Sequence, residues 1–230
     1  MTARDITISP GTRADLAALS RFHYRAGRPA TIARTPDLAP AILRATDADG
    51  SLAGVLTLSM PVLNAPWRDA AWPGRFRTGD RARDASRLNR DLRCISRVIV
   101  DPRHRGLGVA STLVRTYLAR PLTRCTEAIA AMGRLCPFFE AAGMTALDMP
   151  PPPRDARILD ALAALALEPW ELLSPAIRRD ALTPWLVREL RLWARASRAT
   201  RTHRDLPADD LARLAGARLS ARPIAYAHGD

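Results

Sequence analysis

The chain has 230 residues, of which 35 are Lys or Arg and 23 are Asp or Glu, so its formal net charge is +12. Hydrophobic residues make up 47% of the chain, too large a share for an intrinsically disordered protein. No apolar run approaches the roughly 18 to 20 residues that a membrane helix requires, and no signal-peptide pattern opens the sequence. The three cysteines, Cys94, Cys125 and Cys136, are an odd number, which argues against a disulfide framework and predicts a cytoplasmic protein.

Every basic residue is an arginine, and the chain contains neither Lys nor Gln. Such a composition is typical of a very GC-rich genome, so the choice of Arg over Lys carries little functional information. The net charge itself still favours polyanionic partners through counterion release. We therefore predict a nucleic-acid partner and no membrane partner, with solubility and genome composition as the alternative explanations for the charge.

Residues 1–150 alternate between strand and helix patterns, which predicts an α/β arrangement. Strands are expected over residues 5–9, 41–46, 51–60, 93–100, 127–131 and 144–147. Helices are expected from Thr12 to about Tyr24, from Gly106 to about Ala119, and from Pro137 to Gly143. The segment 61–89 is rich in Pro, Gly and Trp, so it is expected to be a long loop, and such loops are often functional.

Pro150–Pro153 marks a boundary, after which the pattern changes to consecutive helices. Residues 1–150 are predicted to be the core, and residues 151–219 a helical appendage that includes helices over 184–197 and 209–219. Residues 220–230 include an extended stretch that could return as the last strand of the sheet and make the appendage an insertion. The arginines of the 184–197 helix form either a solvated face or a stripe that binds a phosphate backbone.

The segment from Val98 to Ala110 places a strand, a loop with two glycines and a helix in succession. The first N–H groups of a helix lack internal acceptors, and the helix dipole adds partial positive charge at the same end. Glycines such as Gly106 and Gly108 let a phosphate approach the backbone, so the pattern is typical of an anion site. The spacing is neither the Walker pattern nor the dinucleotide-binding pattern, and an ordinary turn into a helix remains the simpler alternative.

Two segments together resemble the GNAT family of N-acetyltransferases. Ser96 to Gly108, which includes Arg103-His104-Arg105-Gly106-Leu107-Gly108, is similar to the loop that binds the pyrophosphate of acyl-CoA. Pro137 to Met144 is similar to a later helix-to-strand segment of the family, and the resemblance covers roughly residues 1–148. Residues 21–25, 131–132 and 137–140 are further similar to GNAT domains fused to ABC-type ATPases and, more distantly, to phage Mom-type proteins that modify adenine in DNA.

The resemblance implies a GNAT acyl-CoA-binding fold, in which the fourth and fifth strands of a mixed central sheet separate and hold coenzyme A between them. The expected donor is acetyl-CoA or another acyl-CoA, with the acyl carbonyl polarised by a strand amide. Pantetheine would pair with the backbone of Val98, Ile99 and Val100, and Cys136 and Phe139 would line the same site. The pyrophosphate would lie on the N–H groups of Arg103, His104, Arg105, Gly106, Leu107, Gly108 and Val109.

The sequence departs from the family pattern in two places. The family often supplies a proton from a Tyr at the position of Phe139, and often places a Glu base in the region of Arg93 and Cys94. Neither side chain is present here, which indicates another acid–base set or a weakly basic acceptor such as a nucleobase.

Three residues are candidates for catalysis. Glu127 is expected on the fifth strand, either as a base or as a satisfied structural carboxylate. His23 and Tyr24 are expected beside the acceptor groove, with helix-end packing as the alternative. Cys136 is more typical of a small buried hydrophobe than of an acylated nucleophile, and the His and Cys residues show no metal-ligand spacing.

The candidate acceptor residues are Arg25, Trp67, Trp72 and Arg97. The segment around the two tryptophans interleaves aromatic and basic residues, so it could stack bases and pair with phosphates. Alternatively, its aromatic side chains could fold back on the core. A base inside a duplex would have to be flipped out of the stack to react.

These observations predict an acyl-CoA-dependent N-acyltransferase that modifies a nucleic-acid amine, either a DNA base or a tRNA-linked amine. An acetyltransferase of a small-molecule or protein amine is the alternative, and a non-catalytic module that binds coenzyme A or nucleic acid is a third interpretation. The acceptor, the acyl group and the oligomeric state are left open, with a homodimer among the states considered.

Overall fold

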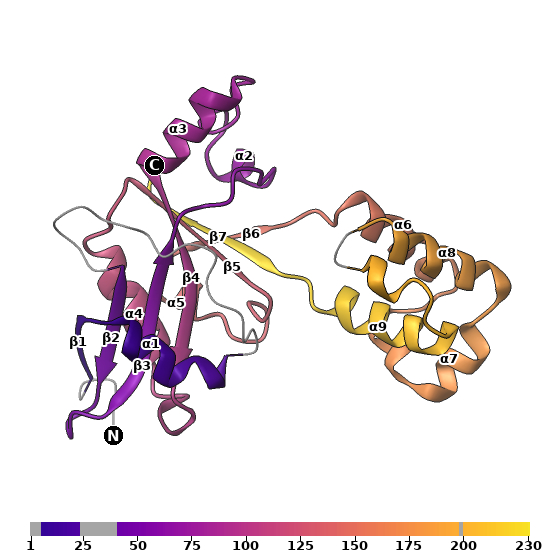
Figure 1. Cartoon of the computed structure of the whole chain (residues 1–230), viewed down its shortest axis with the longest axis horizontal. Helices are drawn as coiled ribbons and strands as arrows, with labels where there is room; N and C mark the ends of the chain where they lie inside the picture. Colours follow the sequence, from indigo (N-terminus) through magenta and orange to yellow (C-terminus); the bar gives the residue numbers. More distant parts are fainter. Residues whose placement is uncertain (1–5, 24–40, 198–199) are drawn as a thin grey trace. The chain divides into compact units, whose positions relative to one another are not determined.

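The computed structural model describes residues 6–23, 41–197 and 200–230, and its chain divides into two compact units. The sheet unit contains Met1–Met149 and Pro223–Asp230, and the helical unit contains Pro150–Arg222. Figure 1 shows both units in the colours of the sequence. Within the described ranges, no helix combines the length and the apolar character needed to cross a membrane.

The sheet unit is built on seven strands in the order β1-β2-β3-β4-β5-β7-β6. Neighbouring strands are antiparallel except for β4 and β5, which run parallel, so the sheet is mixed and the predicted α/β fold class is confirmed. The strands are β1 (Thr7–Pro10), β2 (Ile42–Thr46), β3 (Leu52–Ser59), β4 (Leu92–Val100), β5 (Cys125–Ala130), β6 (Thr145–Asp148) and β7 (Ile224–His228).

The two parallel strands pair over only four residues of each, although β4 has nine residues and β5 has six. Their pairing runs from Leu92 opposite Cys125 to Ile95 opposite Ala128. Beyond Ile95, β4 continues to Val100 with β3 as its partner, while β5 continues with β7. The fourth and fifth strands therefore separate, as the family resemblance implied.

Helices cover both faces of this sheet. Val55 and Leu56 point to opposite faces because side chains alternate along a strand. Val55 packs against Leu19 of α1, whereas Leu56 packs with Leu113 of α4. The helical segments of the unit are α1 (Arg13–Leu19), η2 (Ser20–Phe22), α2 (Arg68–Ala71), α3 (Arg81–Asp91), η3 (Pro102–His104), α4 (Val109–Leu118) and α5 (Phe138–Ala141).

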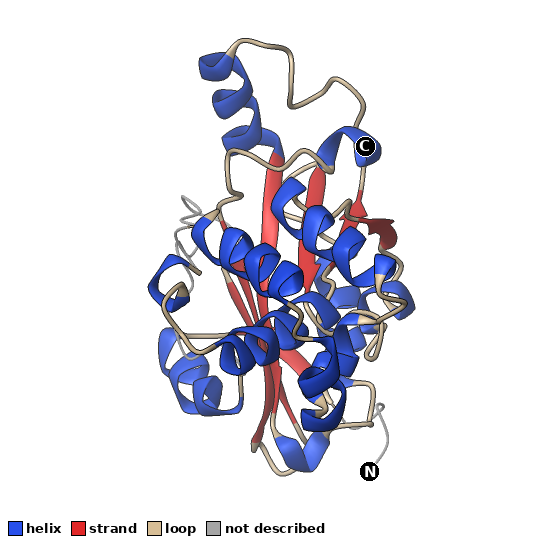
Figure 2. Cartoon of the chain, turned by 90° about the vertical axis from the view of Figure 1, so that its right-hand side faces the viewer, coloured by secondary structure: helices blue, strands red, loops and turns tan. Residues whose placement is uncertain are grey.

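The segment 61–89 is not the continuous loop that we predicted, because it holds α2 and most of α3. The Asp80 side chain accepts hydrogen bonds from the backbone N–H groups of Ala82 and Arg83 and so caps α3. Leu88 is the buried residue of this otherwise polar helix, so the sequence lacks the apolar periodicity that reveals most helices. In two perpendicular views α3 extends beyond the end of the sheet (Figures 1 and 2).

The helical unit follows β6 in the chain and precedes β7. Its core is formed by side chains such as Leu162, Leu190, Trp193 and Leu211. The buried Arg178 donates to the Asp209 carboxylate at 2.6 and 3.0 Å, which fixes α7 against α9. Its elements are α6 (Pro153–Ala164), η4 (Pro169–Leu173), α7 (Pro175–Ala181), α8 (Pro184–Arg195), η5 (Arg201–His203) and α9 (Ala208–Ser220).

Candidate functional site

A cleft of about 620 Å³ lies where β4 and β5 separate. One wall is β4 from Ile95 to Val100, and the facing wall is the end of β5 with the turn that follows it, residues 129–132. The cleft also reaches the start of α4 and the side chains of Phe22 and His23 at the end of η2. Most of these side chains are apolar, which suits the alkyl part of an extended ligand.

A bulge in β4 faces this cleft. Thr57 of β3 lies opposite Arg97 and Leu58 lies opposite Ile95, so Ser96 is an extra residue in β4. The Ser96 hydroxyl accepts a hydrogen bond from Ser59 at 2.6 Å and donates to the Thr57 carbonyl at 3.2 Å. Because no described strand pairs with the cleft side of β4 beyond Ile95, its backbone N–H and C=O groups there can bind an extended ligand.

The loop after β4 carries a second set of backbone donors. Gly106 and Gly108 both adopt a φ of +78°, which a side chain rarely tolerates. Gly108 is the N-cap of α4 and provides no capping side chain, whereas Thr12 caps α1 and Asp80 caps α3. Among the described residues, no oxygen accepts a hydrogen bond from the backbone N–H of Gly106, Leu107 or Gly108. These donors and the helix dipole together form a cradle for an anion.

The side chains at the start of the loop hold it in place. The Asp101 carboxylate accepts hydrogen bonds from the backbone N–H of Arg103 at 2.9 Å and from its guanidinium at 3.0 Å. The hydrogen bonds from Arg103 lower the pKa of Asp101 to about 2. The buried His104 ring lies 3.0 Å from Asp47 of the β2–β3 turn, so its main role is to fix the loop to that turn.

Most of the predicted cofactor residues line the cleft. Arg103 and Leu107 are not among the lining residues, since the guanidinium of Arg103 binds Asp101 and Leu107 packs against the core. Of the predicted acceptor and catalytic residues, His23 and Arg97 also line the cleft, whereas Tyr24 and Arg25 lie outside the described residues. The predicted cofactor residues on its walls are Val98, Ile99, Val100, His104, Arg105, Gly106, Gly108, Val109, Cys136 and Phe139.

Glu127 makes the contacts of a structural carboxylate, the role that we considered as the alternative to a base. It lies on β5 with 1% exposure, one pair before the strands separate. Both of its carboxylate oxygens accept hydrogen bonds at 2.7 Å from the buried guanidinium of Arg68 in α2. This bidentate pair leaves the carboxylate occupied and shielded from water, so it does not present a base to the cleft.

Trp67 and Trp72 do not form the stacking surface that we predicted. Their exposed fractions are 6% and 5%, and they pack with Phe76 and Leu92 in the core. The Trp72 indole also donates to the carbonyl of Gly229 at 2.8 Å. The prediction was wrong because an aromatic and basic sequence pattern does not distinguish a surface loop from one whose rings fold inward.

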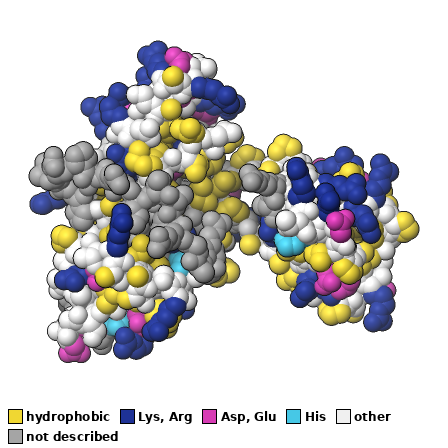
Figure 3. Space-filling model, in the orientation of Figure 1, with side chains coloured by type: hydrophobic (Ala, Val, Ile, Leu, Met, Phe, Trp, Pro, Cys, Tyr) yellow, Lys and Arg dark blue, Asp and Glu magenta, His cyan; other side chains and the backbone are white. Residues whose placement is uncertain are grey.

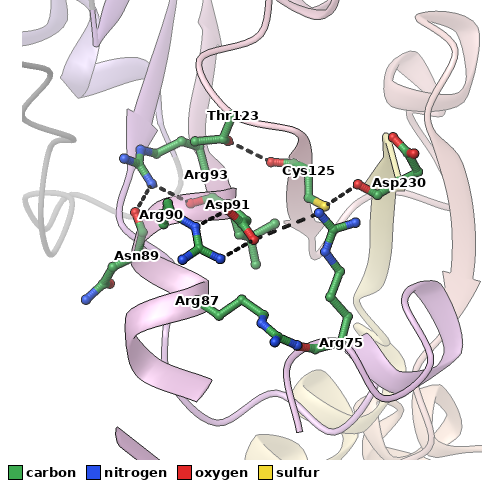
Figure 4. A network of polar contacts seen from close by, with 10 residues as sticks. Arg75, Arg87, Asn89, Arg90, Asp91, Arg93, Thr123, Cys125 and Asp230 are labelled. Carbon is green, nitrogen blue, oxygen red and sulfur yellow. Dashed lines mark hydrogen bonds and ion pairs between the residues drawn. The ribbon is translucent and has the colours of Figure 1, made fainter. Parts of the chain in front are cut away.

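A polar network joins the loop between α2 and α3 to α3 itself (Figure 4). Arg87 donates to the Arg75 carbonyl at 2.9 Å, and Arg90 donates to the Asp91 carboxylate at 2.8 Å. Asp91 also lies 3.9 Å from the Arg75 guanidinium. The hydrogen bond from Arg90 lowers the pKa of Asp91. Asp91 therefore stays charged and holds Arg75 and Arg90 in place.

The position where the family often has a proton-donating Tyr is a buried Phe. Phe139 lies 4.9 Å from the ring of Tyr226 in β7, measured between ring centroids. The Tyr226 hydroxyl donates to Glu140 at 3.3 Å, and burial raises the pKa of this Tyr to about 12. Tyr226 does not line the cleft, so it does not replace the missing donor.

Sequence reasoning missed several lining residues, above all Ser96 and residues 129–132 at the end of β5 and the start of the following turn. The bulge that brings Ser96 into the cleft depends on pairing with a distant strand, and no local pattern reveals it. Ala110 and Ser111 could have been found, since they occupy the first turn of the predicted helix.

Comparison with solved structures finds N-acetyltransferases. The histone acetyltransferase HPA2 and related acetyltransferase from Corynebacterium glutamicum is 20% identical, with 64% of this chain and 89% of that chain covered and a TM-score of 0.40. The Drosophila melanogaster polyamine N-acetyltransferase is 16% identical, with coverage of 65% and 95% and a TM-score of 0.38. A chimera of the Vibrio cholerae spermidine N-acetyltransferase SpeG and hSSAT is 16% identical, with coverage of 61% and 81% and a TM-score of 0.35.

The similarity to GNAT N-acetyltransferases that the sequence indicated is thus found among solved structures. These matches give no support to a relation with the phage Mom-type proteins. No protein-family model and no curated protein matches the chain.

Proposed function

We propose that the chain is an acyl-CoA-dependent N-acyltransferase with acetyl-CoA as its simplest donor. One observation carries this proposal: the unpaired edge of β4 leads directly into the uncapped donors at Gly106 to Gly108. Coenzyme A has an extended amide-containing arm joined to a diphosphate, and these two backbone features match its two parts in order. Each charge-assisted hydrogen bond to the diphosphate contributes roughly 1.5–3 kcal/mol.

Acyl transfer forms a C–N bond and breaks a C–S bond, while the amine loses a proton and the thiolate gains one. Backbone N–H groups at the Ser96 bulge would polarise the acyl carbonyl. His23 lines the cleft and is the titratable side chain that we assign to proton transfer. Glu127 takes no part in this assignment, because Arg68 occupies it.

The acceptor that we propose is an amine of a small molecule or a protein. Burial of Trp67 and Trp72 removes the base-stacking surface on which a nucleic-acid acceptor would have depended. A non-catalytic module that only binds coenzyme A would not transfer the acyl group to any amine. Release of free thiol from acetyl-CoA in the presence of a mixed library of primary amines would exclude that alternative.

The first test of the proposal is a matched pair of glycine substitutions. Gly106 and Gly50 have φ values of +78° and +79°, and a Cβ at either position meets no atom within 4 Å. Gly106→Asp and Gly50→Asp therefore impose the same backbone strain, but only the first places a carboxylate beside the anion cradle. We expect Gly106→Asp to weaken acetyl-CoA binding at least about tenfold by charge repulsion, as measured by titration calorimetry.

The control for this experiment is the variant Gly50→Asp. Gly50→Asp lies in the β2–β3 turn, is not among the residues that line the cleft, and leaves the Asp47–His104 contact in place. This variant should bind acetyl-CoA within about twofold of the unmodified chain, a margin typical of surface changes. Equal affinity of the Gly106→Asp variant and the unmodified chain, or no uptake by either, would contradict the proposal.

A further inference from the structure

The outer face of α8 in the helical unit carries three exposed arginines, Arg188, Arg191 and Arg195. Among the described residues, none of the three makes a salt bridge or a side-chain hydrogen bond. Glu189, the acidic residue of this helix, is buried and accepts both of its hydrogen bonds from Arg157. Arg188 lowers the pKa of Glu189 through its charge, but the two side chains form no salt bridge. Among the described residues, the outer face of α8 therefore presents three arginines that no carboxylate pairs with directly.

Other arginines of the same unit contrast with these three. Arg154, Arg204 and Arg213 each lie within 4.0 Å of an aspartate, at 3.2, 3.1 and 3.4 Å respectively. These three guanidinium groups thus have a direct salt-bridge partner, whereas those of Arg188, Arg191 and Arg195 have none among the described residues. Figure 3, drawn in the orientation of Figure 1, shows dark blue side chains on the side of the helical unit where α6 and α8 lie.

Two apolar side chains share the outer face of α8. Trp185 is 44% exposed and Leu192 is 37% exposed. At about 3.6 residues per turn, both lie with the three arginines within about a third of the helix circumference. The opposite side of α8 packs into the core of the unit through Leu186, Leu190 and Trp193. An exposed indole thus lies on the same helix face as three guanidinium groups that form no salt bridge among the described residues.

We propose that this face of α8 binds a single-stranded nucleic acid, with the arginines on its phosphates and Trp185 stacked on a base. Guanidinium groups pair with phosphates, and an indole stacks on any unpaired base. A lipid surface fits less well, because an interfacial helix needs a broad apolar face and the apolar face of α8 is buried. This interaction is independent of the proposed acyl transfer.

The test measures binding of a fluorescein-labelled 20-nucleotide poly(dT) or poly(U) by anisotropy at several salt concentrations. The variant Arg188→Gln, Arg191→Gln, Arg195→Gln should bind at least about tenfold more weakly than the unmodified chain. Three phosphate contacts to a single strand release counterions with a log–log salt slope of about −2, so the variant should lose about that slope. Trp185→Ala should weaken binding to the single strand about tenfold, and binding to a 20-base-pair duplex much less.

The matched control removes the same charge from ion-paired positions of the unit. Arg154→Gln, Arg204→Gln, Arg213→Gln should leave oligonucleotide affinity within about twofold, because their charges are already balanced. Equal loss in both triple variants, no binding by the unmodified chain, or arginine-dependent binding to anionic vesicles alone would overturn the proposal. Since acetyl-CoA affinity should not change in either variant, failure here is distinguishable from failure of the acyl-transfer proposal.

Discussion

His23 is the residue on which the proposed chemistry most depends. It lies just after η2 and lines the cleft, and imidazole is the side chain that proteins most often use for general acid–base catalysis. We expect His23→Gln to lower kcat by about 100-fold, a loss typical of a removed acid–base group, without changing acetyl-CoA affinity. Unchanged kcat would instead assign His23 to packing at the end of the helix.

Cys136 offers a chemical readout of cofactor binding. It is exposed and lines the cleft, whereas burial raises the pKa of Cys94 to about 12 and that of Cys125 to about 11. The Cys125 thiol also donates to the Asp230 carbonyl at 3.1 Å (Figure 4). Iodoacetamide should therefore alkylate Cys136 first, because the thiolate is the reactive form.

Bound acetyl-CoA should slow the alkylation of Cys136 at least about tenfold when its concentration far exceeds its Kd. Mass spectrometry of the peptide that contains Cys136 gives the rate, and the variant Cys136→Ser shows the labelling of the other two thiols. An equal rate with and without acetyl-CoA would place the ligand away from this wall of the cleft.

At the scale of elements, the Arg68–Glu127 pair joins α2 to β5 beside the point where the strands separate. Glu127→Ala would leave the Arg68 charge buried and unpaired, which costs about 3–5 kcal/mol of unfolding free energy. The double variant Arg68→Met, Glu127→Leu should recover most of that free energy, because apolar residues replace a buried pair at little cost. Urea unfolding measures both effects.

The same double variant separates the two roles considered for Glu127. If Glu127 has only a structural role, the folded double variant should still transfer the acyl group. A folded double variant without turnover would restore Glu127 as the base.

Local patterns predicted the strands and helices whose apolar residues repeat with a clear period, such as β4 and α4. The glycine loop was predicted because backbone conformation at Gly106 and Gly108 depends on those residues themselves. In contrast, α3 has one buried residue, so its cap at Asp80 was the only local indication of a helix. The bulge at Ser96 and the Arg68–Glu127 pair depend on partners far away in the chain, which no local pattern encodes.

At the scale of the whole molecule, the boundary predicted at Pro150 lies one residue after the sheet unit ends at Met149. The extended stretch expected near Pro223 corresponds to β7, which pairs with β5 on one side and β6 on the other. Composition alone could not predict that the aromatic residues of the α2–α3 segment are buried. Their burial follows from packing against β5 and β7, which lie far away in the chain.

The position of β7 has a consequence for how the protein is made. β7 lies between β5 and β6, yet the ribosome synthesises it only after the whole helical unit. In a nascent chain that ends at α9, β5 and β6 therefore still lack β7, the strand with which both of them pair. The helical unit can fold while it emerges, whereas the hydrogen-bond ladder of the sheet unit closes only after Ile224–His228 has been synthesised.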